Sequence, residues 1–151
     1  MNHPNKEIMQ QAIELALQNY KTIGGHAVFA IIVKNDEVIA EAYATVNQEQ
    51  DPTCHAEINA IKIAAKKLGS KKLIDCWLYT TYEPCPMCAA AAVWGRMAGI
   101  VYGASREDQN ELNPWRVAIS AREVIDKSTP RLELYENFMR EECKVLLGLK
   151  P

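Results

Sequence analysis

Two short motifs, each placed where a helix is expected to begin, constrain this chain more than any other feature. They are His55-Ala56-Glu57 and Pro84-Cys85-Pro86-Met87-Cys88, with His55 and Cys85 30 residues apart. Residues at positions i and i+3 share one face of a helix, so Cys85 and Cys88 can bind the same metal ion. One imidazole and two thiolates form a ligand set that suits zinc.

Glu57 stands two residues after His55, a spacing that does not bring side chains together along a helix. Helical side chains lean toward the N-terminus, however, so a metal ion beyond the helix end is within reach of both. Three protein ligands leave the fourth zinc position open, and zinc lowers the pKa of a bound water toward about 7. We expect Glu57 to move the proton from that water to the substrate nitrogen and the leaving amine. The predicted reaction is hydrolytic deamination.

Length and composition place the motifs in one domain, residues 1–151. The longest apolar run, residues 27–33, is far shorter than the roughly 18 residues of a membrane span, and the N-terminal residues do not read as a signal peptide. Five cysteines without a secretory signal indicate reduced thiols, and we expect a cytoplasmic protein. The net charge of -2 does not give the domain the overall positive charge that is typical of nucleic-acid binding, and no membrane partner is expected.

Hydrophobic periodicity predicts an α/β fold with the element order α-β-β-α-β-α-β-α-β-α. Helices are predicted over about 5–20, 54–68, 85–96 and 139–149, and a further helix opens at Asn113-Pro114 and carries Trp115, Ala118, Ile119 and Ile125. Strands are predicted over 27–33, 38–46, 76–81, 99–102 and 131–138, with a polar loop over 47–53. This order predicts three layers, α/β/α, around a mixed sheet of about five strands.

The motif pair resembles the signature of the zinc-dependent cytidine deaminase superfamily. The wider stretches 51–58 and 78–88 are especially similar to the branch that contains bacterial guanine deaminases and tRNA adenosine deaminases. The resemblance implies one Zn²⁺ per chain bound by His55, Cys85 and Cys88, with Glu57 as the proton shuttle. It also implies that backbone amides near Ala56 and Cys85 hold the substrate, and that the chain forms a homodimer whose partner subunit contributes to the pocket.

Two departures from that branch concern the substrate. Its members usually carry Pro-x-Gly-Ala on the first strand, where this chain reads Ala27-Val28-Phe29-Ala30, and a base-gripping asparagine where this chain has Ala44. A site without that amide need not bind the same base, and Phe29 is expected to fill pocket volume. We therefore predict a small amino-substituted N-heterocycle, a free nucleobase, nucleoside or related compound, as the substrate. The candidate substrate-binding residues are Ala56, Phe29, His26, Ala44 and Trp115.

Other interpretations remain open at this point. Cys85 and Cys88 also fit a Cys-x-x-Cys redox pair, although that leaves His55 and Glu57 unexplained, and the site could bind zinc without catalysis. A tRNA adenosine deaminase is the second enzyme hypothesis, with nucleic acid disfavoured. Its basic surface would have to start from one lysine cluster at a helix end: Lys66, Lys67, Lys71 and Lys72.

Several single residues fit either a chemical or a structural role. Cys76 and Cys143 are expected to be buried structural thiols. Trp115 fits the core and the pocket equally well, whereas His3 is expected in a frayed terminus.

Overall fold

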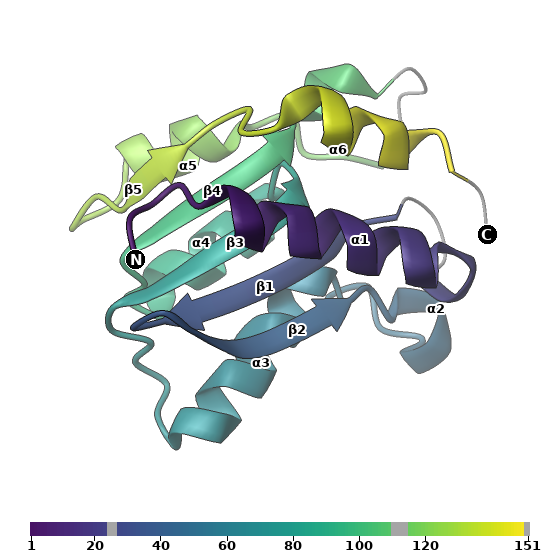
Figure 1. The fold of residues 1–151 in the computed structure, drawn as a ribbon. Coiled ribbons are helices and arrows are strands. Elements are labelled where there is room, and N and C mark those ends of the chain that lie inside the picture. The colour runs from purple at the N-terminus through teal and green to yellow at the C-terminus, as the bar shows by residue number, and fades with distance from the viewer. Residues whose placement is uncertain (24–26, 110–114, 150–151) are drawn as a thin grey trace.

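The computed structural model describes residues 1–23, 27–109 and 115–149 (Figure 1). The elements, in chain order, are α1 (Lys6–Ile23), β1 (Phe29–Lys34), β2 (Glu37–Tyr43), α2 (Val46–Glu49), α3 (Ala56–Leu68), β3 (Cys76–Tyr82), α4 (Pro86–Trp94), β4 (Gly99–Ala104), the 3₁₀ helix η1 (Arg106–Asp108), α5 (Ala121–Asp126), β5 (Glu133–Tyr135) and α6 (Arg140–Leu147). No helix in these three ranges has the length and apolar character needed to cross a membrane.

The strands form one mixed sheet in the order β2-β1-β3-β4-β5. β1 runs antiparallel to both β2 and β3, whereas β3, β4 and β5 are parallel. Parallel neighbours need a crossover connection, and α4 and α5 lie in these two connections. The predicted mixed sheet of five strands is confirmed.

Helices cover both faces of the sheet (Figure 1). Successive side chains of β1 point to opposite faces and so meet different helices. Ala30 and Ile32 pack in a core cluster with residues of α3, α4 and α5. Phe29, Ile31 and Val33 point the other way, into a second cluster with residues of α1 and α6. The three predicted layers are therefore present, with an apolar core on each face of the sheet.

Local chemistry explains several element ends. Asn35 and Asp36 both have positive φ, as a tight turn between β1 and β2 requires. Gly69 adopts the left-handed conformation, φ 61°, and ends α3 where expected. At Gly103 a Cβ atom would lie 2.2 Å from Cys143 Sγ, so glycine lets α6 pack directly on β4. Cys76 and Cys143 are fully buried, as predicted.

Three local predictions are wrong. The expected polar loop over 47–53 begins inside the short helix α2. Residues 115–120 are not helical, because the capping box of Ser120 and Glu123 starts α5 at Ala121; Asn113 and Pro114 lie outside the described residues. The N-terminus is not frayed at His3, whose ring stacks on Trp77 at 4.1 Å and whose Nδ1 lies 2.7 Å from Tyr79 Oη.

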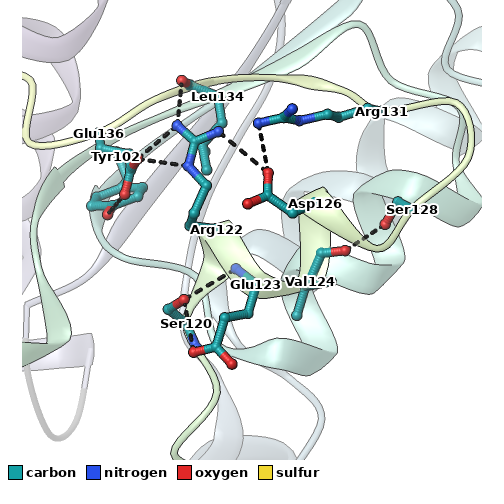
Figure 2. A network of polar contacts seen from close by, with 10 residues as sticks. All are labelled: Tyr102, Ser120, Arg122, Glu123, Val124, Asp126, Ser128, Arg131, Leu134 and Glu136. Carbon is teal, nitrogen blue, oxygen red and sulfur yellow. Dashed lines mark hydrogen bonds and ion pairs between the residues drawn. The ribbon is translucent and has the colours of Figure 1, made fainter.

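A polar network fastens α5 to the edge of the sheet (Figure 2). Arg122 of α5 donates to Glu136 Oε1 from both Nε and Nη2, at 2.8 and 2.6 Å, just after β5. Tyr102 of β4 donates its hydroxyl to the other oxygen of Glu136 at 2.9 Å. The residues that precede α5 are therefore tied at one end to a fixed element.

Candidate active site

The two sequence motifs meet because α3 and α4 begin side by side. His55 is the N-cap residue of α3 and Cys85 is the N-cap residue of α4, both with extended backbone. Neither side chain makes a capping hydrogen bond to its own helix, so both remain available for a ligand at the helix ends. Pro86 occupies the first turn of α4, where a missing backbone donor costs nothing.

The side chains of His55, Cys85 and Cys88 converge on one point. Both sulfur atoms lie 3.6 Å from His55 Nδ1, and the two sulfur atoms lie 3.6 Å from each other. Ligands about 2.1 to 2.3 Å from a tetrahedral zinc ion are separated by roughly 3.4 to 3.8 Å, so this triangle has the dimensions of one face of a zinc site. The three residues are able to hold one metal ion.

Glu57 stands beside this triangle with its carboxyl group buried. The residue is 4% exposed, and Oε2 lies 3.6 Å from Cys88 Sγ. Thr80 of β3 places its hydroxyl 3.3 Å from Oε1, a contact that the sequence motifs do not reveal. Burial raises the pKa of Glu57, which favours a carboxyl group that accepts and returns a proton. The arrangement suits acid-base catalysis next to a metal ion.

The electrostatics of the triangle favour one thiolate. Hydrogen bonding from Cys88, with a further contribution from His55, holds the pKa of the Cys85 thiol far below its usual range. The same contact with Cys85, together with burial, raises the pKa of Cys88. Hydrogen bonding to Cys85 raises the pKa of His55. A cation at the centre of the triangle would favour the deprotonated form of all three groups.

A cavity of about 590 Å³ opens above the triangle, within the usual range of about 300–1,000 Å³ for small-molecule sites. His55, Ala56, Glu57 and Cys85 form part of its lining. Ala44 and Trp115 also line it, and Trp115 is 90% exposed and so not a core residue. The substrate-binding role of Ala56, Ala44 and Trp115 stays a prediction.

The predicted pocket role of Phe29 is wrong. Its side chain lies in the core cluster of α1 and α6, on the sheet face opposite α3. The preceding residue, Val28, lines the cavity instead, because successive side chains of a strand alternate between faces. His26 lies outside the described residues.

The structure adds pocket residues that the motifs miss. Tyr82 and Glu83 line the cavity and lie in the wider stretch 78–88, but the motif alone does not show that their side chains face the site. Asn47 of α2, and Arg106 and Gln109 from η1 and its C-cap, also line it, but these short segments carry no recognisable motif. Tyr82 donates its hydroxyl to Gln109 Oε1 at 2.8 Å, which joins the end of β3 to the turn after β4.

The three-layer fold and the metal-binding group beside a buried glutamate define a zinc-dependent hydrolase. The chain belongs to the family described as the cytidine and deoxycytidylate deaminase zinc-binding region, whose model matches residues 2–104. It is therefore a zinc-dependent hydrolytic deaminase, as the sequence motifs predict.

Relatives of known activity fall on the predicted branch. The chain is 41% identical to the guanine deaminase of Bacillus subtilis over 111 residues, which cover 74% of this chain and 70% of the relative. It is 36% identical to the tRNA-specific adenosine deaminase of Aquifex aeolicus over 120 residues, 79% of this chain and 76% of the relative. A solved structure from a study of A-to-I editing by tRNA:A34 deaminases matches with a TM-score of 0.72 and 28% identity, covering 93% of this chain and 96% of that one.

Proposed function

We propose that this protein deaminates a small amino-substituted N-heterocycle, a free nucleobase, nucleoside or related compound. In this proposal His55, Cys85 and Cys88 bind the zinc ion, and Glu57 is the catalytic acid and base. The observation that carries it is the buried carboxyl group of Glu57, which lies 3.6 Å from Cys88 Sγ and lines the cavity.

The reaction replaces an exocyclic amino group by oxygen and releases ammonia. Zinc, when bound, supplies Lewis acidity and a water of lowered pKa. Glu57 takes a proton from the water that adds to the ring carbon and delivers it to nitrogen, so that the leaving group departs as neutral ammonia. The buried position of Glu57 supports this role, because a carboxyl group with a raised pKa gives up its proton less readily to solvent.

The lysine cluster does not supply a nucleic-acid-binding surface at the cavity. Lys66 and Lys67 lie in the last turn of α3, whereas Glu57 lies in its first turn. Nine residues of helix at 1.5 Å each separate them by about 14 Å along the axis. The lysine cluster is therefore at the far end of α3 from the cavity and is poorly placed to grip RNA around it.

The comparisons also support an alternative, a tRNA adenosine deaminase. The tRNA:A34 deaminase structure matches 93% of this chain and a guanine deaminase structure from Nitrosomonas europaea matches 92%, so coverage does not separate the two activities. An anticodon stem-loop RNA must therefore be tested beside the small molecules.

The lining also bears on which heterocycle is bound. Ala44 presents only a methyl group, so it cannot read the edge of a base by hydrogen bonding. Uncharged polar side chains on the same lining include Asn47, Tyr82 and Gln109. We infer that the substrate is read by these side chains or by backbone groups.

The test combines metal analysis with a substrate screen. Purified protein should contain about one zinc per chain and release ammonia from at least one amino-substituted purine, pyrimidine, pterin or triazine. The stem-loop RNA serves as the competing substrate, because RNA binding weakens steeply with salt whereas binding of a neutral base does not. Deamination of the RNA alone would replace this proposal by the tRNA alternative.

We also propose that the chain is a homodimer. Trp94, the last residue of α4, is 84% exposed, and we place it in the contact between the two subunits. Equilibrium sedimentation should give twice the chain mass of 17.0 kDa, and Trp94→Asp should shift the protein to the monomer.

A further inference from the structure

The outer wall of the cavity includes a segment that little apolar packing holds in place. Residues 115–120 are non-helical, and Trp115, Arg116 and Val117 line the cavity. Trp115 is 90% exposed, Val117 58% and Ile119 42%. Because these apolar side chains remain in solvent, burial contributes little to the position of the segment. Its hydrogen bonds therefore decide where this wall stands.

Arg106 makes two of these hydrogen bonds. From η1 its guanidinium donates through Nη1 to the carbonyl of Ile119 at 3.0 Å and through Nη2 to the carbonyl of Val117 at 2.9 Å. A planar guanidinium can bridge two acceptors in this way, whereas a lysine ammonium is a single point of charge. Arg106 also lines the cavity, so the bridge forms at the pocket itself.

Glu83 holds the two ends of this arrangement together. It is 5% exposed and directly precedes the Pro84-Cys85 pair. Its Oε1 accepts from the backbone N of Arg106 and from Ser105 Oγ, both at 3.2 Å, and its Oε2 accepts from the backbone N of Ala121 at 3.0 Å. One buried carboxylate thus joins the turn that carries Arg106 to the first residue of α5.

The turn that carries Arg106 is itself anchored. Asp108 accepts from the backbone N of Ser105 at 2.8 Å. Arg140 of α6 binds the two oxygens of Asp108 at 2.6 and 2.9 Å, a paired contact that fixes orientation as well as distance. Movement of the wall therefore requires these contacts to break or the Arg106 bridge to open.

We propose that Glu83 and Arg106 are positioning residues that hold residues 115–120 as the substrate-facing wall of the cavity. They set the KM of the deaminase without contributing to the zinc group. This role rests on the proposed function in so far as it concerns KM, whereas the holding of the wall does not depend on turnover.

Two substitutions at Arg106 separate the bridge from its charge. Arg106→Lys keeps the positive charge and loses the planar guanidinium that binds two carbonyl groups, and Arg106→Gln loses both the charge and the guanidinium. In both variants KM should rise about tenfold, the effect of losing roughly one hydrogen bond to a charged group, while kcat changes by less than about twofold. Zinc should stay at about one per chain in both. A wild-type KM in Arg106→Lys would assign Arg106 to charge recognition and overturn the proposal.

Limited trypsin digestion gives a measurement without turnover. Cleavage after Arg116, relative to cleavage after the exposed Lys71, should be about tenfold faster in both Arg106 variants, because local opening controls the rate. Arg131→Gln is the matched control, since Arg131 is exposed and, within the described residues, its ion pair is with Asp126. An unchanged cleavage rate in the Arg106 variants overturns the proposal.

Glu83→Gln tests the positioning role that the proposal gives to Glu83. It replaces an acceptor by a donor, so one backbone N–H loses its partner; KM and cleavage after Arg116 should both rise while zinc is retained. Loss of zinc would assign Glu83 to the metal group and contradict its place in the wall. A wild type inactive on every heterocycle, with fast cleavage in the variants, would count against the proposed function alone.

Discussion

Two regions of the cavity are held in place by different forces. We call the group His55, Glu57, Cys85 and the adjacent Cys88 the floor, and residues 115–120 the outer wall. At the floor, His55 and Cys85 cap two helices whose bodies pack on the sheet, and Glu57 and Cys88 are buried. At the wall, residues 115–120 are largely exposed and hydrogen-bonded through Arg106. The floor therefore suits chemistry that needs fixed distances, whereas the wall can change without disturbing that chemistry. Substitutions in the two regions should separate zinc content and kcat from KM.

The largest effect is expected from Cys85→Ser. A hydroxyl group is a much weaker zinc ligand than a thiolate, so the variant should lose both the metal and detectable turnover. Zinc measured by mass spectrometry against protein concentration checks this. Cys143→Ala is the control, because Cys143 is fully buried against β4, away from the triangle, and should keep its zinc.

Glu57→Gln should break catalysis while leaving the floor intact. The amide has nearly the same shape but cannot accept and return a proton, so kcat should fall by at least about 10², with zinc retained. The exposed Glu142→Gln on α6 provides a matched charge change. An active Glu57→Gln enzyme would disprove the proton-transfer role.

A pair of tryptophan substitutions compares the wall with the proposed dimer surface. Trp115→Ala should raise KM roughly three- to tenfold, as expected for the loss of an aromatic contact of about 0.5–1.5 kcal/mol. Trp94→Ala changes a residue of similar exposure, 84% against 90%, and should alter association instead of substrate binding. Steady-state kinetics and sedimentation on both proteins test the assignment. A normal KM in Trp115→Ala would remove this side chain from the pocket.

The smallest effect concerns the anchor of the wall. Hydrogen bonding to Arg140 lowers the pKa of Asp108, so this carboxylate stabilises the folded state above its unfolded pKa of about 3.9. That stability disappears as the pH falls through the lower folded pKa. Asp108→Asn should lower the melting temperature at neutral pH, and its difference from wild type should vanish in strong acid.

The exposed Asp75→Asn is the control for that measurement and should leave the melting temperature nearly unchanged at both pH values. A difference between Asp108→Asn and wild type that persists unchanged in strong acid would contradict the role given to Asp108.

Sequence patterns predicted those features that depend on short-range geometry. The i, i+3 spacing of Cys85 and Cys88 places both side chains on one helix face. Both motifs also start a helix, so the sequence predicts that His55, Cys85 and Cys88 come together. Phe29 was misplaced because a one-residue difference along a strand sends a side chain to the other face of the sheet. The branch's motif locates the strand but not which of its residues faces the cavity.

The chain by itself determined the deaminase family, the five-strand mixed sheet and the group of residues at the floor. Only the tertiary structure decided how the wall is built. Arg106 binds the carbonyls of Val117 and Ile119, and backbone carbonyls are the same in every residue, so no sequence pattern marks them as partners. Glu83 likewise gains its meaning from the backbone donors of Arg106 and Ala121, which distant segments bring to it when the sheet assembles.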